Sequence, residues 1–213
     1  MFPRNNVFIS KRESHLMSYI TNGLYLSGLG GVTREGSLES LNITHVLNVA
    51  VELMSLKYKC GDRSVNVRYV HLQDNSQENI LPYLNELIHY IHDIISKGDN
   101  IVVHCVGGVS RSATICIAFM IKFHDMTLRE AYHHVLKQRS IIHPNNSFWR
   151  SLICFEENVR QSTSVELLPY ITGMVADVYK NETERRILIG WMDHVFYNWC
   201  LHLVILILQI IFA

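Results

Sequence analysis

The stretch that decides the fold is residues 101–112, which read IVVHCVGGVSRS. Its first three residues are apolar and β-branched, which indicates a short buried strand. Gly107 and Gly108 then allow the backbone to bend, and an apolar helical pattern follows from Ser112 to about His124. A buried strand that passes through a glycine loop directly into a helix is typical of α/β proteins.

The segments on either side continue this alternation of strands and helices. We expect a hairpin at 18–27 about the turn Asn22-Gly23, a helix at 33–41, strands at 44–51 and 65–72, a helix from Ile80 to about Ser96 ended by Gly98, a helix from Thr127 to about Gln138, and a last helix from Asn145 or Asn146 to about Arg160. We therefore predict an α/β fold, in which a central mixed β-sheet has helices on both faces and a hydrophobic C-terminal helix follows.

The composition narrows the class of protein. The 213 residues are 48% hydrophobic and 18% charged, which excludes a disordered chain. Lys+Arg and Asp+Glu balance at 19 each, so no nucleic-acid partner is expected. Five widely spaced cysteines and the lack of an apolar leader favour free thiols and a cytoplasmic location. Twelve histidines show no metal-binding spacing, and we expect neither a metal nor another cofactor.

The loop after residue 104 has the features of an anion site. A helix N-terminus presents unpaired N–H groups and a partial positive charge. Successive N–H groups of the preceding loop add an anion-binding nest, which the glycines let approach a ligand closely. The sequence therefore predicts a site for a phosphate-like anion. The residues predicted to bind it are Val106, Gly107, Gly108, Val109, Ser110 and Arg111.

Cys105 opens this loop and is the candidate nucleophile. A sulfur among N–H donors and facing Arg111 is stabilised as the thiolate, and a thiolate under a bound phosphate can attack phosphorus. The planar guanidinium of Arg111 matches two phosphate oxygens, and Ser112 can hydrogen-bond the sulfur and help it leave. The alternative is a buried structural cysteine, the interpretation that we prefer for Cys116 and Cys154, each on a helix face.

The motif HCVGGVSRS, residues 104–112, resembles the signature of the dual-specificity branch of the cysteine-dependent protein tyrosine phosphatase superfamily, HC-x-A-G-x-S-R-S. Gly107 stands where that pattern usually has Ala. ITHVLNVA at 43–50, the Asp74 loop, the stretch 112–156 and GMVADVY at 173–179 also resemble the small atypical dual-specificity phosphatases. This resemblance covers about residues 19–189. It implies hydrolysis of phosphotyrosine and phosphoserine/phosphothreonine through a phosphocysteine, without a metal.

The leaving alkoxide or phenolate needs a proton, and carboxylates upstream of Cys105 could supply it. The candidates are Asp62, Asp74, Glu78, Asp93 and Asp99. Asp74 lies in the loop directly after a predicted strand, where functional groups tend to lie. By resemblance, Asp74 protonates the leaving oxygen and later deprotonates the attacking water. The alternative is that Asp74 is only a solvent-exposed residue of the loop. In that case Glu78 would be the general acid.

Two further residues are assigned by resemblance. His104 orients the phosphate loop through hydrogen bonds, or it is a neutral histidine packed at a strand end. Asn145 braces the phosphate loop, or it is a plain helix cap.

The substrate class follows from two variable loop positions and from the resemblance. Val106 and Val109 bring no positive charge, which argues against an inositol phospholipid and suits a single phosphate on a protein side chain. The resemblance implies a shallow site for phosphotyrosine, phosphothreonine and phosphoserine, and phosphorylated proteins as partners, mitogen-activated protein kinases among them. The alternative is a phospho-binding pseudophosphatase or scaffold tethered to a membrane.

The end of the chain has a different character. Residues 195–213, VFYNWCLHLVILILQIIFA, carry no charge, and as a helix they would span about 28 Å, close to the bilayer core. We expect a transmembrane tail anchor in an intracellular membrane that leaves the catalytic domain in the cytosol. The alternatives are a helix packed on the domain's own surface and an atypical chain end. The expected organisation is a flexible segment at 1–18, the dual-specificity phosphatase catalytic domain at 19–162, a C-terminal extension at 163–194, and this tail. Residues 163–190 are expected to be a linker or an extension over the domain that is poor in strands.

Overall fold

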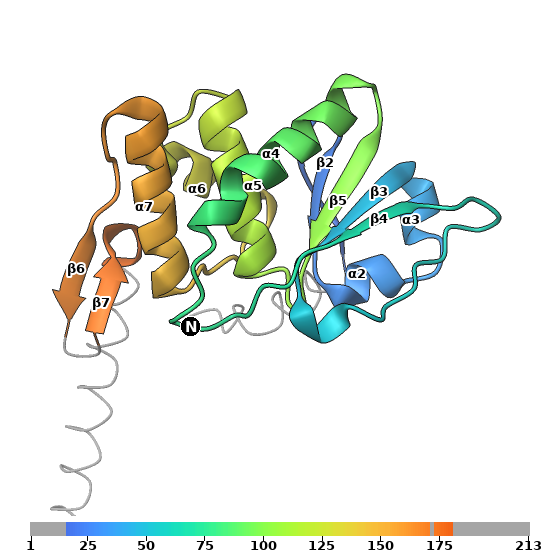
Figure 1. Cartoon of the computed structure of the whole chain (residues 1–213), viewed down its shortest axis with the longest axis horizontal. Helices are drawn as coiled ribbons and strands as arrows, with labels where there is room; N and C mark the ends of the chain where they lie inside the picture. Colours follow the sequence, from blue (N-terminus) through green and yellow to red (C-terminus); the bar gives the residue numbers. More distant parts are fainter. Residues whose placement is uncertain (1–15, 171–172, 181–213) are drawn as a thin grey trace, which may run out of the picture. The chain divides into compact units, whose positions relative to one another are not determined.

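The computed structural model describes residues 16–170 and 173–180, and its centre is a five-stranded sheet (Figure 1). The strand order is β1-β2-β5-β3-β4. β1 is antiparallel to β2, and the other neighbouring pairs are parallel, so the sheet is mixed. The strands are β1 (Ser18–Thr21), β2 (Leu24–Ser27), β3 (Ile43–Asn48), β4 (Asn66–Tyr69) and β5 (Asn100–His104).

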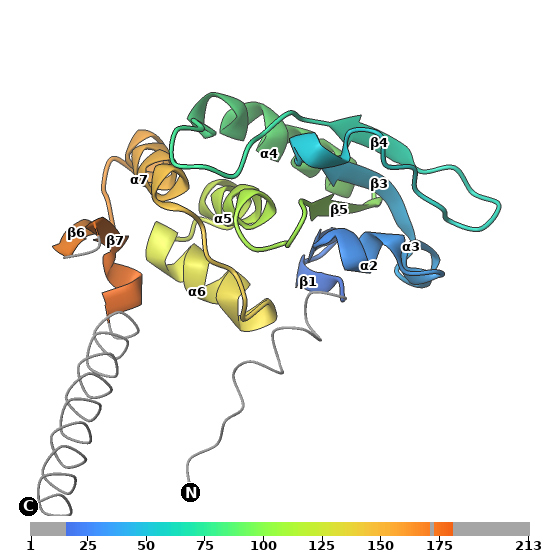
Figure 2. The same ribbon diagram turned by 90° about the horizontal axis from the view of Figure 1, so that it is seen from below.

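Helices cover both faces of this sheet, as predicted. The short helices α2 (Leu29–Thr33) and α3 (Ser37–Ser40) lie on one face (Figure 2). The other face carries α4 (Leu81–Ser96), α5 (Arg111–Phe123), α6 (Leu128–Gln138) and α7 (Asn146–Arg160). α5 is apolar around its circumference and buried from Arg111 to Ile121, which is typical of a central helix. The short 3-10 helix η1 (Val51–Leu53) follows β3.

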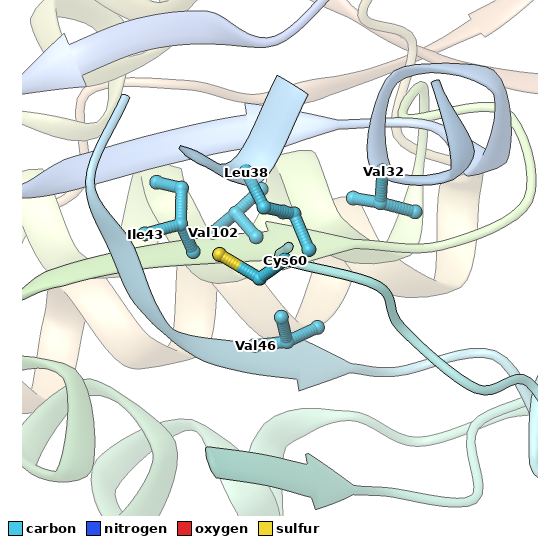
Figure 3. Packing of buried hydrophobic residues seen from close by; sticks show 6 residues of the cluster. All are labelled: Val32, Leu38, Ile43, Val46, Cys60 and Val102. Carbon is cyan, nitrogen blue, oxygen red and sulfur yellow. The ribbon is translucent and has the colours of Figure 1, made fainter. Parts of the chain in front are cut away.

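The core on the α2–α3 face is a small cluster of buried side chains from the sheet, both helices and the segment before β4 (Figure 3). It consists of Val32, Leu38, Ile43, Val46, Cys60 and Val102. On the opposite face the apolar stripe of α4 is buried, as its 3.6-residue period predicts. Leu84, Leu87, Ile88, Ile91 and Ile94 form that stripe.

Several predicted boundaries are confirmed and others are wrong. The turn at Asn22-Gly23 joins β1 to β2, and the capping box at Thr127 opens α6. The single helix expected at 33–41 is instead two helices, because the chain is extended at Arg34 and left-handed at Gly36. The strands expected at 44–51 and 65–72 are shorter, as β3 and β4. Cys116 is buried as expected, whereas Cys154 is exposed.

The chain separates into two units after Leu167. From this boundary on, β6 (Leu167–Tyr170) pairs with β7 (Gly173–Ala176), and the 3-10 helix η2 (Asp177–Tyr179) follows. The segment expected to be a linker or an extension poor in strands thus contains one small two-stranded sheet. The tail at 195–213 lies outside the described residues. Among the residues that the structure describes, no helix is both long and apolar enough to cross a membrane.

Candidate active site

Cys105 directly follows β5, at the start of the loop that leads into α5. Its side chain is buried, and its Sγ accepts hydrogen bonds from the Gly108 N–H and from Ser112 Oγ, each at 3.2 Å. Gly108 has a φ of +64°, and a Cβ there would come within 2.5 Å of the backbone carbon of Ser27. The loop can therefore close around the sulfur only with glycine at this position.

The loop is held by donors on its outer side. Each backbone carbonyl of residues 105–109 accepts a hydrogen bond from outside the loop. His104 Nδ1 donates to the carbonyl of Cys105 at 3.2 Å, and the Leu29 N–H donates to that of Val106 at 2.9 Å. The Arg139 side chain donates to the carbonyls of Gly107 at 3.1 Å and Gly108 at 2.7 Å, and the His143 N–H donates to that of Val109 at 2.9 Å. In a trans peptide the carbonyl and the following N–H point in opposite directions. The N–H groups of residues 106–110 therefore turn inward, as that of Gly108 does toward Cys105 Sγ. A run of inward N–H groups is an anion nest.

Arg111 is the first residue of α5, and its side chain is buried. Its Nη1 donates to Glu52 Oε2 at 2.6 Å and to the Leu72 carbonyl at 3.0 Å. Its Nε lies 3.5 Å from Asp74 Oδ2, without the alignment of a hydrogen bond. Within the described part of the chain this buried Nε has no hydrogen-bond partner. A buried donor left unpaired costs free energy, which an oxyanion beside it would recover.

Asp74 reaches the same place from the loop after β4. Its Oδ1 accepts hydrogen bonds from Ser110 Oγ and Asn145 Nδ2, each at 2.9 Å. Asn145 also caps α7, since its Oδ1 accepts the Phe148 N–H at 3.0 Å. Asn145 is thus a helix cap whose side chain also contacts the Asp74 loop, and its backbone N–H donates to Ser110 Oγ of the phosphate loop at 3.3 Å. Glu78 instead accepts the Gln73 N–H within its own loop at 2.9 Å, so of these two candidate acids Asp74 is the one whose carboxylate contacts the phosphate loop.

His104 is buried behind the loop. Burial lowers its pKa to about 4, against the smaller opposing effect of its hydrogen bond to the Cys105 carbonyl. The ring is therefore neutral at pH 7, with the proton on Nδ1, which faces that carbonyl. Nε2 then accepts the hydroxyl of Tyr58 at 2.6 Å, and burial raises the pKa of this phenol. Orienting the loop and packing as a neutral ring are thus compatible roles.

Three residues of the site lie outside the motif at 104–112 and were not predicted from the sequence. Glu52 contacts Arg111, Tyr58 contacts His104, and Arg139 holds two loop carbonyls from the end of α6. Glu52 follows β3, and β3 is parallel to its neighbour β5. Because parallel neighbours end at one sheet edge, topology could have pointed to Glu52. Within the described residues, no group of three or more His, Cys, Asp or Glu side chains could hold a metal ion.

Comparison with known proteins gives one consistent result. The family model "Dual specificity phosphatase, catalytic domain" matches residues 24–158. The chain is 33% identical to dual specificity protein phosphatase 14 of Mus musculus over 87% of this chain and 90% of that protein. It is 31% identical to dual specificity protein phosphatase 18 of Homo sapiens over 80% and 89% of the two chains.

Solved structures show the same fold. The human tyrosine phosphatase-like serine/threonine/tyrosine-interacting protein matches with a TM-score of 0.61 and 26% identity, over 67% of this chain and 96% of that one. Human DUSP28 matches in fold with a TM-score of 0.60 and 23% identity, over 68% and 95% of the two chains. The chain belongs to the dual specificity phosphatase family of protein phosphatases.

Proposed function

We propose that this chain hydrolyses phosphotyrosine and phosphoserine/phosphothreonine on proteins through a phosphocysteine at Cys105. The observation that carries the proposal is the convergence at one loop of an anion nest, a sulfur, and a buried Arg111 Nε that makes no hydrogen bond within the described residues. A phosphoryl group seated there presents its phosphorus to Sγ. Its oxygens meet the inward N–H groups and the Nε of Arg111, which stabilise the charge of the transition state.

The reaction has two displacements. In the first, Cys105 Sγ attacks phosphorus in line, the S–P bond forms, and the P–O bond to the side chain of the substrate breaks. Asp74 transfers its proton to the leaving oxygen. In the second, water attacks the phosphocysteine, Asp74 accepts the proton of the water, and phosphate departs. The Ser112 hydroxyl, 3.2 Å from Sγ, stabilises the sulfur as it leaves.

A single phosphate on a protein fits the loop better than a multiply charged head group. Val106 is 42% exposed and Val109 is partly buried, so neither variable position brings a cation to the mouth of the site. The relatives are named dual specificity protein phosphatases, which supports activity on more than one class of phosphorylated side chain. Mitogen-activated protein kinases are proposed as substrates on the resemblance alone.

Location is a separate proposal. We place the enzyme in the cytoplasm, held at an intracellular membrane by residues 195–213, because that segment is uncharged and long enough to cross a bilayer as a helix. Membrane fractionation of the full chain and of a chain ending at residue 194 tests this. Recovery of the full chain entirely in the soluble fraction would contradict the anchor.

The activity is tested by hydrolysis of an aryl phosphate and of phosphopeptides, with and without vanadate. We expect vanadate-sensitive turnover that Cys105→Ser abolishes while phosphate binding persists. Cys154→Ser is the matched control, because Cys154 is an exposed cysteine on α7, and it should retain full activity. Phosphate binding by the wild-type chain without turnover would instead support the pseudophosphatase, which the presence of Cys105 and Arg111 in one site does not favour.

A further inference from the structure

Arg111 is anchored through one of its nitrogens. Nη1 has two hydrogens, and two acceptors take them: Glu52 Oε2 at 2.6 Å and the Leu72 carbonyl at 3.0 Å. Nε, on the other side of the guanidinium, has no hydrogen-bond partner in the described residues, and the nearest carboxylate oxygen given for it is Asp74 Oδ2, an ion-pair contact at 3.5 Å. A phosphate binds arginine through two nitrogens of one edge. With Nη1 taken, the edge that remains is the one formed by Nε and Nη2.

The turn that presents Glu52 is itself fixed. The side chain of Asn48, at the end of β3, accepts the Ala50 N–H at 3.0 Å and donates to the Leu53 carbonyl at 2.8 Å. Asn48 is fully buried, so these bonds are shielded from water. The Val51 N–H then bonds to the Leu72 carbonyl at 3.3 Å, the same oxygen that accepts from Arg111. Glu52 is thus placed against Arg111 by the backbone on both sides of it.

We propose that Glu52 is a positioning residue that acts through Arg111, holding Nη1 so that the Nε–Nη2 edge faces the phosphoryl group. This inference rests on the proposed phosphatase activity. A long side chain such as arginine loses considerable rotamer freedom when it is fixed. The charge-assisted hydrogen bond at Nη1 offsets this loss of conformational entropy in the free enzyme. The guanidinium is therefore already oriented when the phosphoryl group binds.

Glu52 could instead have the opposite effect on phosphate binding. A carboxylate on Arg111 could act as a competitor that neutralises the guanidinium and weakens phosphate binding. The two roles predict opposite signs when Glu52 is removed. Positioning predicts weaker oxyanion binding and slower turnover, whereas competition predicts tighter oxyanion binding.

The test compares Glu52→Ala and Glu52→Gln with the wild-type chain. For Glu52→Ala we expect kcat/KM for an aryl phosphate to fall roughly tenfold to a hundredfold, and the affinity for vanadate to fall with it. Glu52→Gln keeps an acceptor oxygen without the charge and should lie between Ala and wild type. Glu35→Gln removes an equal charge from an exposed position and should change neither quantity. Tighter vanadate binding by either Glu52 variant would overturn the proposal.

A double-mutant cycle tests whether Glu52 acts through Arg111. Calorimetric binding of inorganic vanadate is measured for wild type, Glu52→Gln, Arg111→Lys and the double variant. Because Lys lacks the planar fork, Glu52→Gln should have little further effect in the Arg111→Lys background. Equal losses in both backgrounds would contradict the inference. If the wild-type chain binds vanadate but hydrolyses no phosphoester, the proposed function is wrong. The double-mutant cycle still tests whether Glu52 acts through Arg111, because it is measured by vanadate binding alone.

Discussion

Asn145 Nδ2 donates a hydrogen bond of 2.9 Å to Asp74 Oδ1, although the two residues are 71 positions apart in the chain. Asn145 Oδ1 at the same time caps α7 through the Phe148 N–H. One amide therefore connects the loop that carries the proposed general acid to the start of the last helix of the catalytic unit. Ser110 Oγ of the phosphate loop donates to the same Asp74 oxygen at 2.9 Å, so the acid loop is also held against the phosphate loop.

The two functions of Asn145 can be separated by substitution. Asn145→Asp keeps the oxygen that caps α7 but places a second carboxylate beside Asp74, so we expect slower turnover of phosphopeptides with a nearly unchanged melting temperature. Asn145→Ala loses the cap as well and should destabilise the protein by about 1 kcal/mol. Turnover is measured with a phosphopeptide and stability by thermal unfolding. Full activity of Asn145→Asp would show that the bond to Asp74 is dispensable.

Asp74→Asn should affect substrates according to their leaving groups. Removing a general acid costs about 10²–10⁴-fold in rate where the leaving oxygen is poor, as in a phosphoserine peptide. The loss should be much smaller for an aryl phosphate with a good leaving group. Glu78→Gln is the matched control, because the Glu78 carboxylate accepts the Gln73 N–H within its own loop. Equal losses on both substrates would refute the acid role of Asp74.

The buried His104 predicts a specific dependence of stability on pH. Its pKa is about 4 in the folded protein, below the ordinary value of 6.5. Between these values the unfolded chain binds a proton that the folded protein does not. The contribution of the neutral His104 ring to the free energy of unfolding is therefore fully present above pH 6.5 and is lost as the pH falls toward 4. The loss is at most about 1.4 kcal/mol per pH unit in this window, or about 2 kcal/mol from pH 7 to pH 5.

The measurement is the free energy of unfolding in urea for wild type and His104→Gln at several pH values. The variant lacks the titrating ring, so its stability should fall less between pH 6.5 and pH 5. Parallel curves for the two proteins would mean that His104 titrates alike in the folded and unfolded chains.

The two glycines of the phosphate loop should respond differently to alanine. Gly107→Ala restores the residue usual in the family motif, and its Cβ would meet Val109 Cγ2 at 3.2 Å, a side chain that can shift. We expect a stability change within about 1 kcal/mol and nearly full activity. Gly108→Ala forces a left-handed φ on alanine and a contact of 2.5 Å with the Ser27 backbone. It should destabilise by about 1–3 kcal/mol and abolish most activity. Equal tolerance at both positions would contradict this account of the loop.

The sequence predicts local features of this protein well and long-range ones poorly. The strand, loop and helix of residues 101–112 follow from neighbouring residues, as do the stripe of α4 and the capping box of α6. Arg139 shows the limit: an arginine at a helix end normally reads as a solvated charge, yet here it is fully buried against Gly107 and Gly108. Only the packing of α6 beside the loop gives it that role.

The role of Glu52 depends partly on local sequence and partly on long-range packing. Residues 44–51 read as one continuous strand, which hides the turn at η1. The strand ends early because the side chain of Asn48 takes the Ala50 N–H and the Leu53 carbonyl, bonds of a turn rather than of a sheet. A buried asparagine in an apolar run was the signal for this turn, and the turn is what brings Glu52 to Arg111.

The outward carbonyls of the phosphate loop have a consequence for how such enzymes diverge. In the proposed mechanism most groups that bind the phosphate are main-chain N–H groups, which remain whatever side chain occupies positions 106 and 109. Substitutions at these two positions can therefore alter which molecule carries the phosphate while its capture is preserved. New specificities can arise here without rebuilding the chemistry beneath them.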